Sequence, residues 1–310
     1  MASSGGTVNW SLTDHLLATQ EHLYKSATQH PFLLAGAEGR LPKDILSHWL
    51  SNDRLYIHAY LRAAGNLLAS IDLPKQVPGS QEAFETQLAD WVIEALVAIR
   101  KEERFFIDVA ERYDLGIEIA LPSLPAQAST QDATSKDTTH GGKLPGLVQM
   151  ESIFASVGAP RQTSPDSPSK VPGVALVQPL FTTTAAANTP PTLLPWLEGA
   201  LTFWGTERCY LGAWSWARGK AEERRSSGEH AEEKDADGGA LRKEFIPNWS
   251  SPEFAQFVDK LGKLIDDSVA AVLEGKEGEE RERIKAGILA RVEGKWRTLL
   301  EAERQFWPDV

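Results

Sequence analysis

The stretch that decides the fold is W-L-S-N-D-R-L-Y-I-H-A-Y, residues 49–60, which lies within a longer pattern from Pro42 to Ser70. Apolar and aromatic residues recur there at steps of three and four, the period of a helix with one buried face. No alternation of apolar and polar residues competes with this interpretation. The pattern therefore predicts one long helix, with Pro42 in its first turn.

The same period recurs along most of the chain. Helices are predicted from Ser11 with Ser11 or Thr13 as the cap, over 81–113 as one helix or a pair, over 193–217, and as two helices within 251–310 that divide near 275–278. Together these segments predict an all-α, single-domain helical bundle over residues 1–310.

Two polar segments interrupt the helical pattern. Residues 121–170 are dense in small polar residues and proline, and residues 219–243 are rich in charge, so we predict a flexible insertion at each place. Within the first, only the island 147–157 looks apolar enough to pack. The uncharged stretch 171–197 carries five prolines, which predicts loop and short helical pieces rather than a membrane span.

The charge balance excludes several classes of partner. With 43 acidic and 32 basic residues the net charge is −11 at pH 7, so no global field draws the chain to nucleic acid or anionic lipid. The single Cys209 excludes an internal disulfide and a Cys-cluster zinc site, and the N-terminus shows no secretory signal. We expect a cytoplasmic protein with no nucleic-acid partner and no membrane partner.

The motifs of common cofactor and metal enzymes are absent. The sequence contains no G-x-G-x-x-G, G-x-x-x-x-G-K-[ST], H-E-x-x-H or G-x-S-x-G, and none of its seven histidines completes an E-x-x-H pair. The sequence therefore predicts neither a bound cofactor nor a metal.

Two helical stripes place a carboxylate among aromatic rings. The first consists of Trp49, Asp53, Tyr56 and Tyr60, and the second of Phe203, Glu207, Tyr210 and Trp214. For Asp53 a hydrogen bond to a neighbouring helix, or a surface pair with a nearby arginine, is equally open. Cys209 lies about 200° around the helix from Glu207 and is expected to be a buried structural thiol.

Other acids near rings have a simpler interpretation. Glu303 precedes Phe306 by three residues and Trp307 by four, but from spacing alone an exposed acid at a helix end is favoured. Glu102 and Glu103, before Phe105 and Phe106, could contribute a third carboxylate to a pocket, but a solvated acidic edge of an amphipathic helix is favoured.

Carboxylates within aromatic stripes would form a bundle pocket that stacks a flat heterocycle and hydrogen-bonds its nitrogens. Burial among rings would raise the pKa of such a carboxyl toward neutrality, as general acid–base catalysis requires. A small heterocyclic molecule is therefore the predicted partner.

Six short motifs follow one another along the chain. They are H-P-F at 30–32, W-L-x-x-D-x-x-Y at 49–56, E-x-x-F-F at 102–106, L-x-F-W-x-x-E-x-x-Y-L-x-A-W at 201–214, N-W-S-S-P-E-F at 248–254 and E-x-x-F-W at 303–307. The ordered set resembles the TenA-like family, thiaminase II and its relatives, whose fold is the haem-oxygenase-like helical bundle. The resemblance covers nearly all the predicted helices and neither insertion.

The resemblance implies hydrolysis of a thiamin-related aminopyrimidine without a cofactor, with release of ammonia, formate or a thiazole. It implies that Asp53 holds the amino group and ring nitrogen of the pyrimidine, that Tyr56 lines the pocket and that Glu303 shuttles protons. Relatives of this type often assemble as dimers or tetramers, so a homo-oligomer is implied as well.

The departure from the family pattern concerns the nucleophile. Typical thiaminase II members carry a Cys after a Pro where this chain reads T-F-W-G at 202–205. A sister group without that Cys relies on carboxylates, and this chain is more similar to it, with Glu207 as the second acid or base. The implied mechanism is attack of water on an amidine or formamide carbon, with Glu303 and Glu207 dividing the roles of base and acid.

Two other functions remain open. A non-catalytic pyrimidine-binding or regulatory protein would keep the pocket without turnover. A cofactorless oxidase like pyrroloquinoline-quinone synthase would share the bundle, but it is disfavoured because no His- and Arg-rich pocket for a polyanionic substrate is visible.

Overall fold

The computed structural model describes residues 10–76, 82–118, 142–158, 192–226 and 234–310, and all regular elements within these ranges are helical. In chain order they are α1 (Leu12–Thr19), α2 (Glu21–Thr28), α3 (Pro31–Ala37), α4 (Lys43–Ser70), α5 (Phe84–Tyr113), α6 (Pro145–Ala155), α7 (Leu197–Ser226), the π-helical turn η2 (Leu241–Phe245), α8 (Ile246–Trp249), α9 (Pro252–Leu273) and α10 (Gly278–Arg304). The predicted all-α class is confirmed.

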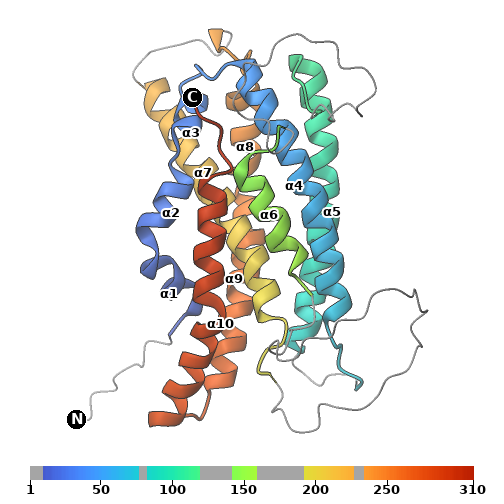
Figure 1. Ribbon diagram of the computed structural model, residues 1–310, viewed down its shortest axis with the longest axis vertical. Helices are drawn as coiled ribbons and strands as arrows, with labels where there is room; N and C mark the ends of the chain where they lie inside the picture. The colour runs from blue at the N-terminus through green and yellow to red at the C-terminus, as the bar shows by residue number, and fades with distance from the viewer. Residues whose placement is uncertain (1–9, 77–81, 119–141, 159–191, 227–233) are drawn as a thin grey trace, which may run out of the picture.

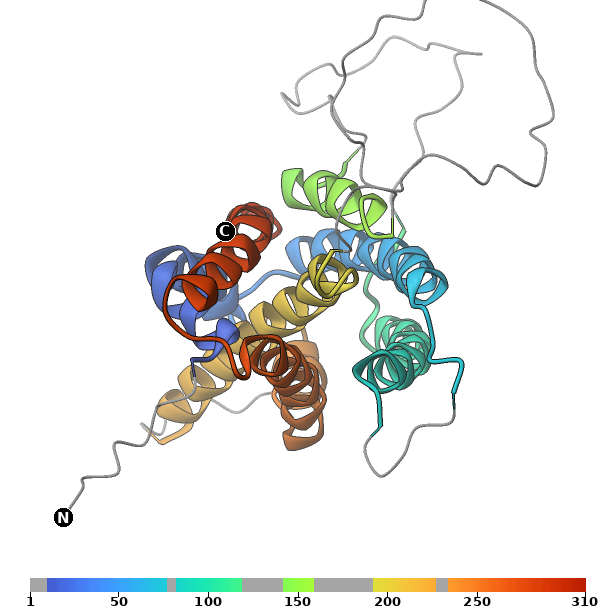
Figure 2. The same ribbon diagram turned by 90° about the horizontal axis from the view of Figure 1, so that it is seen from below.

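The long helices run along the long axis of the molecule (Figure 1). The short α1, α2 and α3 lie along one flank beside α10, and α5 forms the opposite edge. Seen end-on, α7 lies in the middle of the bundle (Figure 2), where it packs against α2, α3, α8, α9 and α10. None of the helices described combines the length and the apolar character needed to cross a bilayer.

The central place of α7 follows from its composition. Residues 199–206 are all buried, and a helix that is apolar or small on every side has to be surrounded by other elements. Gly205 allows α10 to approach closely, because a Cβ there would lie 3.1 Å from both Trp296 and Leu299. In this position Glu207 and Tyr210, in the next turns of α7, form hydrogen bonds with residues of α4.

The starts of α1 and α4 and the end of α5 lie close to the positions that the sequence predicts. Ser11 caps α1, since its Oγ accepts a hydrogen bond from the backbone N–H of Asp14. Pro42 lies one residue before α4 as its N-cap rather than in its first turn. Helix α5 is a single unbroken helix that ends at Asp114, whose backbone is left-handed with φ of 54°.

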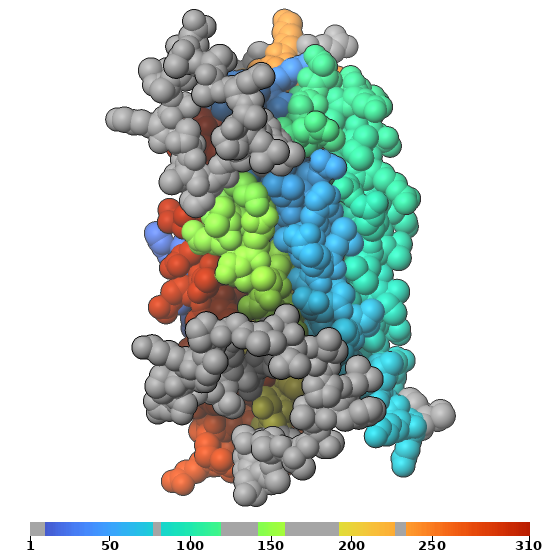
Figure 3. All heavy atoms as spheres, turned by 45° about the vertical axis from the view of Figure 1, so that its right-hand side comes forward, coloured from blue at the N-terminus to red at the C-terminus, as the bar shows by residue number. Residues whose placement is uncertain are grey.

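The first predicted insertion contains a core helix. Within 121–170, Pro145–Ala155 form α6, and the buried residues Leu147, Met150 and Phe154 pack this helix against α4 and α10. Apolar residues at steps of three and four decide this outcome against the polar composition around them. Figure 3 shows α6 lying between those two helices on one face of the molecule.

The second predicted insertion, 219–243, is also shorter than expected. Helix α7 continues to Ser226, and residues from 234 onward lie against the bundle. Arg242 and Asp235 form an ion pair in which each side chain is only 3% exposed, which fixes this segment in place. The rest of both predicted insertions, and most of 171–197, lie outside the described residues.

A cluster of aromatic rings joins the two ends of the chain to the bundle. Its members, with ring centroids 4.6 to 6.4 Å apart, are Phe32, Trp49, Trp214, Trp249, Phe306 and Trp307. The indole N–H of Trp307 also donates a hydrogen bond of 2.8 Å to the carbonyl of Ala27. The C-terminal residues are thereby held against α3, α4 and α7.

Candidate active site

Asp53 lies on the inner face of α4 and is 1% exposed, which excludes a surface pair with an arginine. The hydroxyl of Tyr210 on α7 donates a hydrogen bond of 2.8 Å to Asp53 Oδ2, whereas Oδ1 is buried and has no hydrogen-bond partner among the described residues. Burial raises the pKa of Asp53 well above its usual range, and the nearby Glu102 carboxylate raises it further. Because an unsatisfied buried oxygen is costly, Oδ1 is suited to a donor group of a ligand.

Glu207 lies one turn before Tyr210 on α7 and is half-buried. Its Oε1 accepts a hydrogen bond of 2.6 Å from the hydroxyl of Tyr60 on α4. Burial raises the pKa of Glu207 to about 8, although the hydrogen bond from Tyr60 opposes the rise. This carboxyl is therefore mostly protonated at neutral pH and can donate a proton.

Glu102 on α5 is an acid whose position the sequence interpretation missed. Its Oε1 accepts a hydrogen bond of 2.8 Å from the indole N–H of Trp249, and burial raises its pKa to about 7. Glu103 is only 6% exposed and lies against Arg54 and His58 of α4, so its interpretation as part of a solvated edge is wrong. Glu102 shares a helix face with Ile99 and Phe106, three residues before it and four after it. That i−3 and i+4 spacing is the signal that could have identified it.

Glu303, in the last turn of α10, is 4% exposed, so the interpretation as an exposed helix-end acid is wrong. Burial raises the pKa of Glu303 well above its usual range, and the charges of Asp53 and Glu207 raise it further. The pKa of Tyr56 is raised by burial and by the charges of the same three acids. The structure therefore brings Asp53, Glu207 and Glu303 together around Tyr56.

A cavity of about 20 Å³ lies among these groups, enough for roughly one water molecule. It is lined by Asp53, Tyr56, Ile57, Ile99, Glu102, Glu207, Tyr210 and Phe254. Four of the predicted site residues, Asp53, Tyr56, Glu207 and Tyr210, thus face one space. Glu303 does not line the cavity, but its pKa is raised by the charges of Asp53 and Glu207, which do.

The other predicted binding residues support the cavity from behind. Tyr60 holds Glu207, and the ring of Phe203 packs edge-on against Tyr60 with centroids 4.8 Å apart. Trp49 and Trp214 belong to the aromatic cluster rather than to the cavity lining, and their buried indole N–H groups have no hydrogen-bond partner among the described residues. Helical spacing predicted their inward face correctly but not which neighbours they meet.

Cys209 is 2% exposed, and burial raises the pKa of its thiol well above the usual value. The charge of Arg208 opposes this rise but is outweighed by burial, so the thiol stays protonated, which agrees with the structural role expected for Cys209. Within the described ranges, no three His, Cys, Asp or Glu side chains are placed to hold a metal ion.

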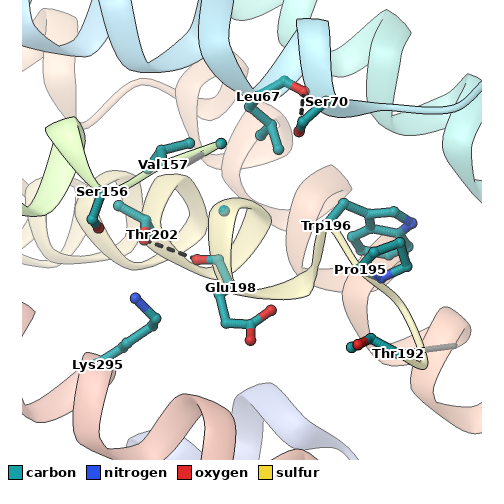
Figure 4. A pocket seen from close by; sticks show the side chains of 12 residues that line it. Leu67, Ser70, Ser156, Val157, Thr192, Pro195, Trp196, Glu198, Thr202 and Lys295 are labelled. Atoms are coloured by element: carbon teal, nitrogen blue, oxygen red, sulfur yellow. Dashed lines mark hydrogen bonds between the residues drawn. The ribbon is translucent and has the colours of Figure 1, made fainter. Parts of the chain in front are cut away.

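A larger hollow, of about 350 Å³, lies where α4 and α6 end and α7 begins (Figure 4). The charged residues in its lining are Glu198 and Lys295, and Glu198 Oε1 accepts a hydrogen bond of 2.9 Å from Arg291. None of the four acids described above lines this hollow. The smaller cavity is therefore the candidate site.

A family model and several solved structures are similar to this chain. The model of the TENA/THI-4/PQQC family matches residues 17–75, which include Asp53 and Tyr56. A TenA homologue from Pyrococcus furiosus superposes with a TM-score of 0.54 at 18% identity, over 95% of this chain and 97% of that one. Residues 17–75 are thus similar to this family, and the chain as a whole shares the fold of TenA homologues. Its helices form the haem-oxygenase-like bundle of TenA proteins, as the resemblance implied.

Further relatives of this TenA-like protein carry regulatory descriptions. A TenA family transcription regulator from Silicibacter sp. TM1040 superposes with a TM-score of 0.55 at 12% identity, over 96% of each chain. A probable transcription factor from Fusarium pseudograminearum (strain CS3096) is 25% identical over 262 residues, which are 83% of this chain and 45% of that protein. The chain thus spans less than half the length of this fungal relative.

Proposed function

We propose that this TenA-like protein hydrolyses a thiamin-related aminopyrimidine without a cofactor. The observation that carries the proposal is the Asp53 carboxyl, which is buried, bonded to Tyr210 through one oxygen and unpartnered at the other, beside Glu207 at one cavity. An aminopyrimidine presents an amino N–H next to a ring nitrogen. A carboxyl group, with an oxygen that accepts and a hydroxyl that donates when protonated, matches both positions.

In the proposed reaction, water attacks an amidine or formamide carbon and the carbon–nitrogen bond breaks. Glu207, whose pKa of about 8 keeps it mostly protonated at neutral pH, gives its proton to the leaving nitrogen. Glu303, in its ionised form, takes the proton of the attacking water, and Asp53 orients the ring. The products are ammonia, or formate and an amine, according to the bond that breaks.

A pyrimidine ring is larger than this cavity of about 20 Å³, so the proposal requires side chains at its edge to move on binding. Tyr56, Tyr210 and Phe254 line the cavity and are only partly buried, which leaves their rings room to turn. The buried Asp53 would then remain as the fixed contact.

Incubation with aminomethyl- and formylaminomethyl-pyrimidines, followed by assays of ammonia and formate, tests the proposal. We expect turnover by the unaltered protein and a loss of about 100-fold or more in Glu303→Gln and Asp53→Asn. Glu301→Gln, an exposed acid on the same helix as Glu303, is the control and should leave the rate unchanged. No product from either compound would exclude the hydrolase.

A pyrimidine-binding regulatory protein is the second candidate, favoured by the descriptions of two relatives as a transcription regulator and a probable transcription factor. Calorimetric titration with the same compounds separates the two functions. Binding that Asp53→Asn weakens, without ammonia or formate, would favour the regulatory protein. Release of either product would favour the hydrolase.

A further inference from the structure

The cavity is surrounded by acids from four helices and has no basic side chain in its lining, as far as the described residues go. Asp53 on α4, Glu102 on α5 and Glu207 on α7 line it, and the charges of Asp53 and Glu207 raise the pKa of Glu303 on α10. The neighbouring hydroxyls and the indole of Trp249 contribute no positive charge. Four carboxyl groups therefore share one buried region without a counter-ion.

A second observation, independent of the acids' number, points to a ligand. Asp53 is 1% exposed, lines the cavity, and has an Oδ1 atom with no hydrogen-bond partner among the described residues. Folded proteins seldom leave a buried carboxyl oxygen unsatisfied, because its desolvation is then uncompensated. A group with N–H donors and positive charge would satisfy both the unpartnered oxygen and the missing counter-charge.

We propose that the ligand binds this cavity as a planar cation of the amidinium class, and that its arrival displaces one proton from the cluster of four acids. The inference rests on the proposed function for the location of the site, and it adds the charge of the ligand and the proton balance. In the exchange, a protonated carboxyl and the cation give a carboxylate–cation pair and a free proton. An amidinium offers two parallel N–H donors, which match the two oxygens of a carboxylate.

The electrostatics of the site support this exchange. Burial raises the pKa of Glu102 to about 7 and that of Glu207 to about 8, and it raises the pKa values of Asp53 and Glu303 well above their usual range. The cluster therefore holds protons at neutral pH that an adjacent cation would expel. The titratable groups that face it are Asp53, Tyr56 and Tyr60 from α4, Glu102 from α5, Glu207 and Tyr210 from α7, and Glu303 from α10, while α9 contributes only Phe254.

The exchange also has a consequence for the proposed reaction. A site whose carboxyls are all protonated has no general base, because a base must be ionised to accept a proton. Proton loss on cation binding creates that base only when the ligand is present. Glu102, with a pKa of about 7, ionises more readily than Glu207, with a pKa of about 8, so Glu207 keeps the proton that the acid step requires.

Benzamidinium and benzamide form a matched pair of probes, since both are flat and similar in shape but only the first is charged. Benzamidinium keeps its charge throughout the neutral range, so any proton released on binding comes from the protein. Titration calorimetry in phosphate and in Tris buffers gives the number of protons released. We expect about one proton per benzamidinium, and at neutral pH an affinity at least about tenfold higher than for benzamide.

Glu102→Gln removes one acid while keeping an acceptor for Trp249, so we expect fewer protons released and a smaller preference for benzamidinium. Glu111→Gln, an exposed acid on the same helix, is the control and should change neither value. Equal affinity for the two probes, or no proton release, would overturn the exchange. Binding of an aminopyrimidine but not of benzamidinium would overturn it and leave the proposed function standing, whereas binding of neither would remove both.

Discussion

The hydrogen bond from Tyr60 to Glu207 tunes the acid that we place at the centre of the reaction. A donor bonded to a carboxylate stabilises its ionised form, so this bond holds the pKa of Glu207 below the value that burial alone would give. Tyr60→Phe removes the donor and keeps the ring against Phe203. The proton affinity of one residue can therefore be changed without opening the core.

We predict that Tyr60→Phe moves the alkaline limb of the kcat/KM profile, which reports Glu207 as the acid, to higher pH by up to about one unit. A pH–rate profile of the two proteins measures the shift. Tyr113→Phe serves as the control, because the Tyr113 hydroxyl donates to Glu244 at the surface, and its profile should match that of the unaltered protein. A shift to lower pH would contradict the role given to Glu207.

Sequence spacing predicts which face of a helix is buried more reliably than it predicts which residues that face contacts. Asp53 and Glu207 were placed among rings because the i, i+4 and i+7 pattern fixes which side of a helix is buried. The sequence favours a solvated edge for both Glu102 and Glu103, yet Glu102 lines the cavity and Glu103 is only 6% exposed, because α5 packs against α4. Spacing alone also favours an exposed position for Glu303. Its burial depends on the aromatic cluster, whose members come from segments that are distant in the sequence.

Helix α6 shows what a short element contributes to the site. Gly146 at its start lies against the end of α10, where its backbone N–H donates a hydrogen bond of 3.0 Å to the carbonyl of Gln305. A Cβ at Gly146 would collide with backbone atoms of Ala302 and Phe306. The other end of α6 carries Phe154, whose ring packs against aromatic residues of α4 and α7 beside the cavity.

Gly146→Ala should therefore displace α6 from α10 and lower the free energy of unfolding by about 1–3 kcal/mol, since backbone atoms cannot make room as a flexible side chain can. Urea unfolding measures this loss. Gly287→Ala on α10 is the matched control, because nothing lies near its Cβ and Gly→Ala in an open helix interior raises stability by about 0.5–1 kcal/mol. Equal effects of the two substitutions would exclude the close contact as the cause.

Helix α6 also shows that the average composition of a segment does not predict every helix within it. The polar residues on both sides of α6 predict an insertion. The apolar residues spaced from Leu147 to Phe154 are nevertheless enough to pack a helix of eleven residues against the bundle. Composition averages over a segment, whereas packing depends on the few side chains that share one face. Element boundaries were accordingly best predicted where a cap or a proline fixes them, as at Ser11 and Pro42.

At the scale of the whole molecule, the burial of four acids gives stability an unusual pH dependence. Sequence periodicity predicted the bundle but not this property, because the size of the cavity and the exposure of each acid depend on how four helices meet. Asp53, Glu102, Glu207 and Glu303 all have raised pKa values in the folded protein. Above about pH 4.5 the unfolded chain releases these protons while the folded protein keeps them.

Because the folded state then binds more protons than the unfolded state, the free energy of unfolding should fall as pH rises from about 6.5 to 8, by up to about 1.4 kcal/mol per unit for each acid still protonated. The contribution of Glu102 ends near its pKa of about 7 and that of Glu207 near about 8. His30 and His58, whose pKa values are lowered mainly by burial, oppose this trend only below about pH 6.5. Urea unfolding across this range measures the slope, which should be shallower in the double variant Glu102→Gln/Glu207→Gln. Stability that stays flat or increases with pH would show that these carboxyls are ionised in the folded protein, and the site would then have lost the protons on which its chemistry depends.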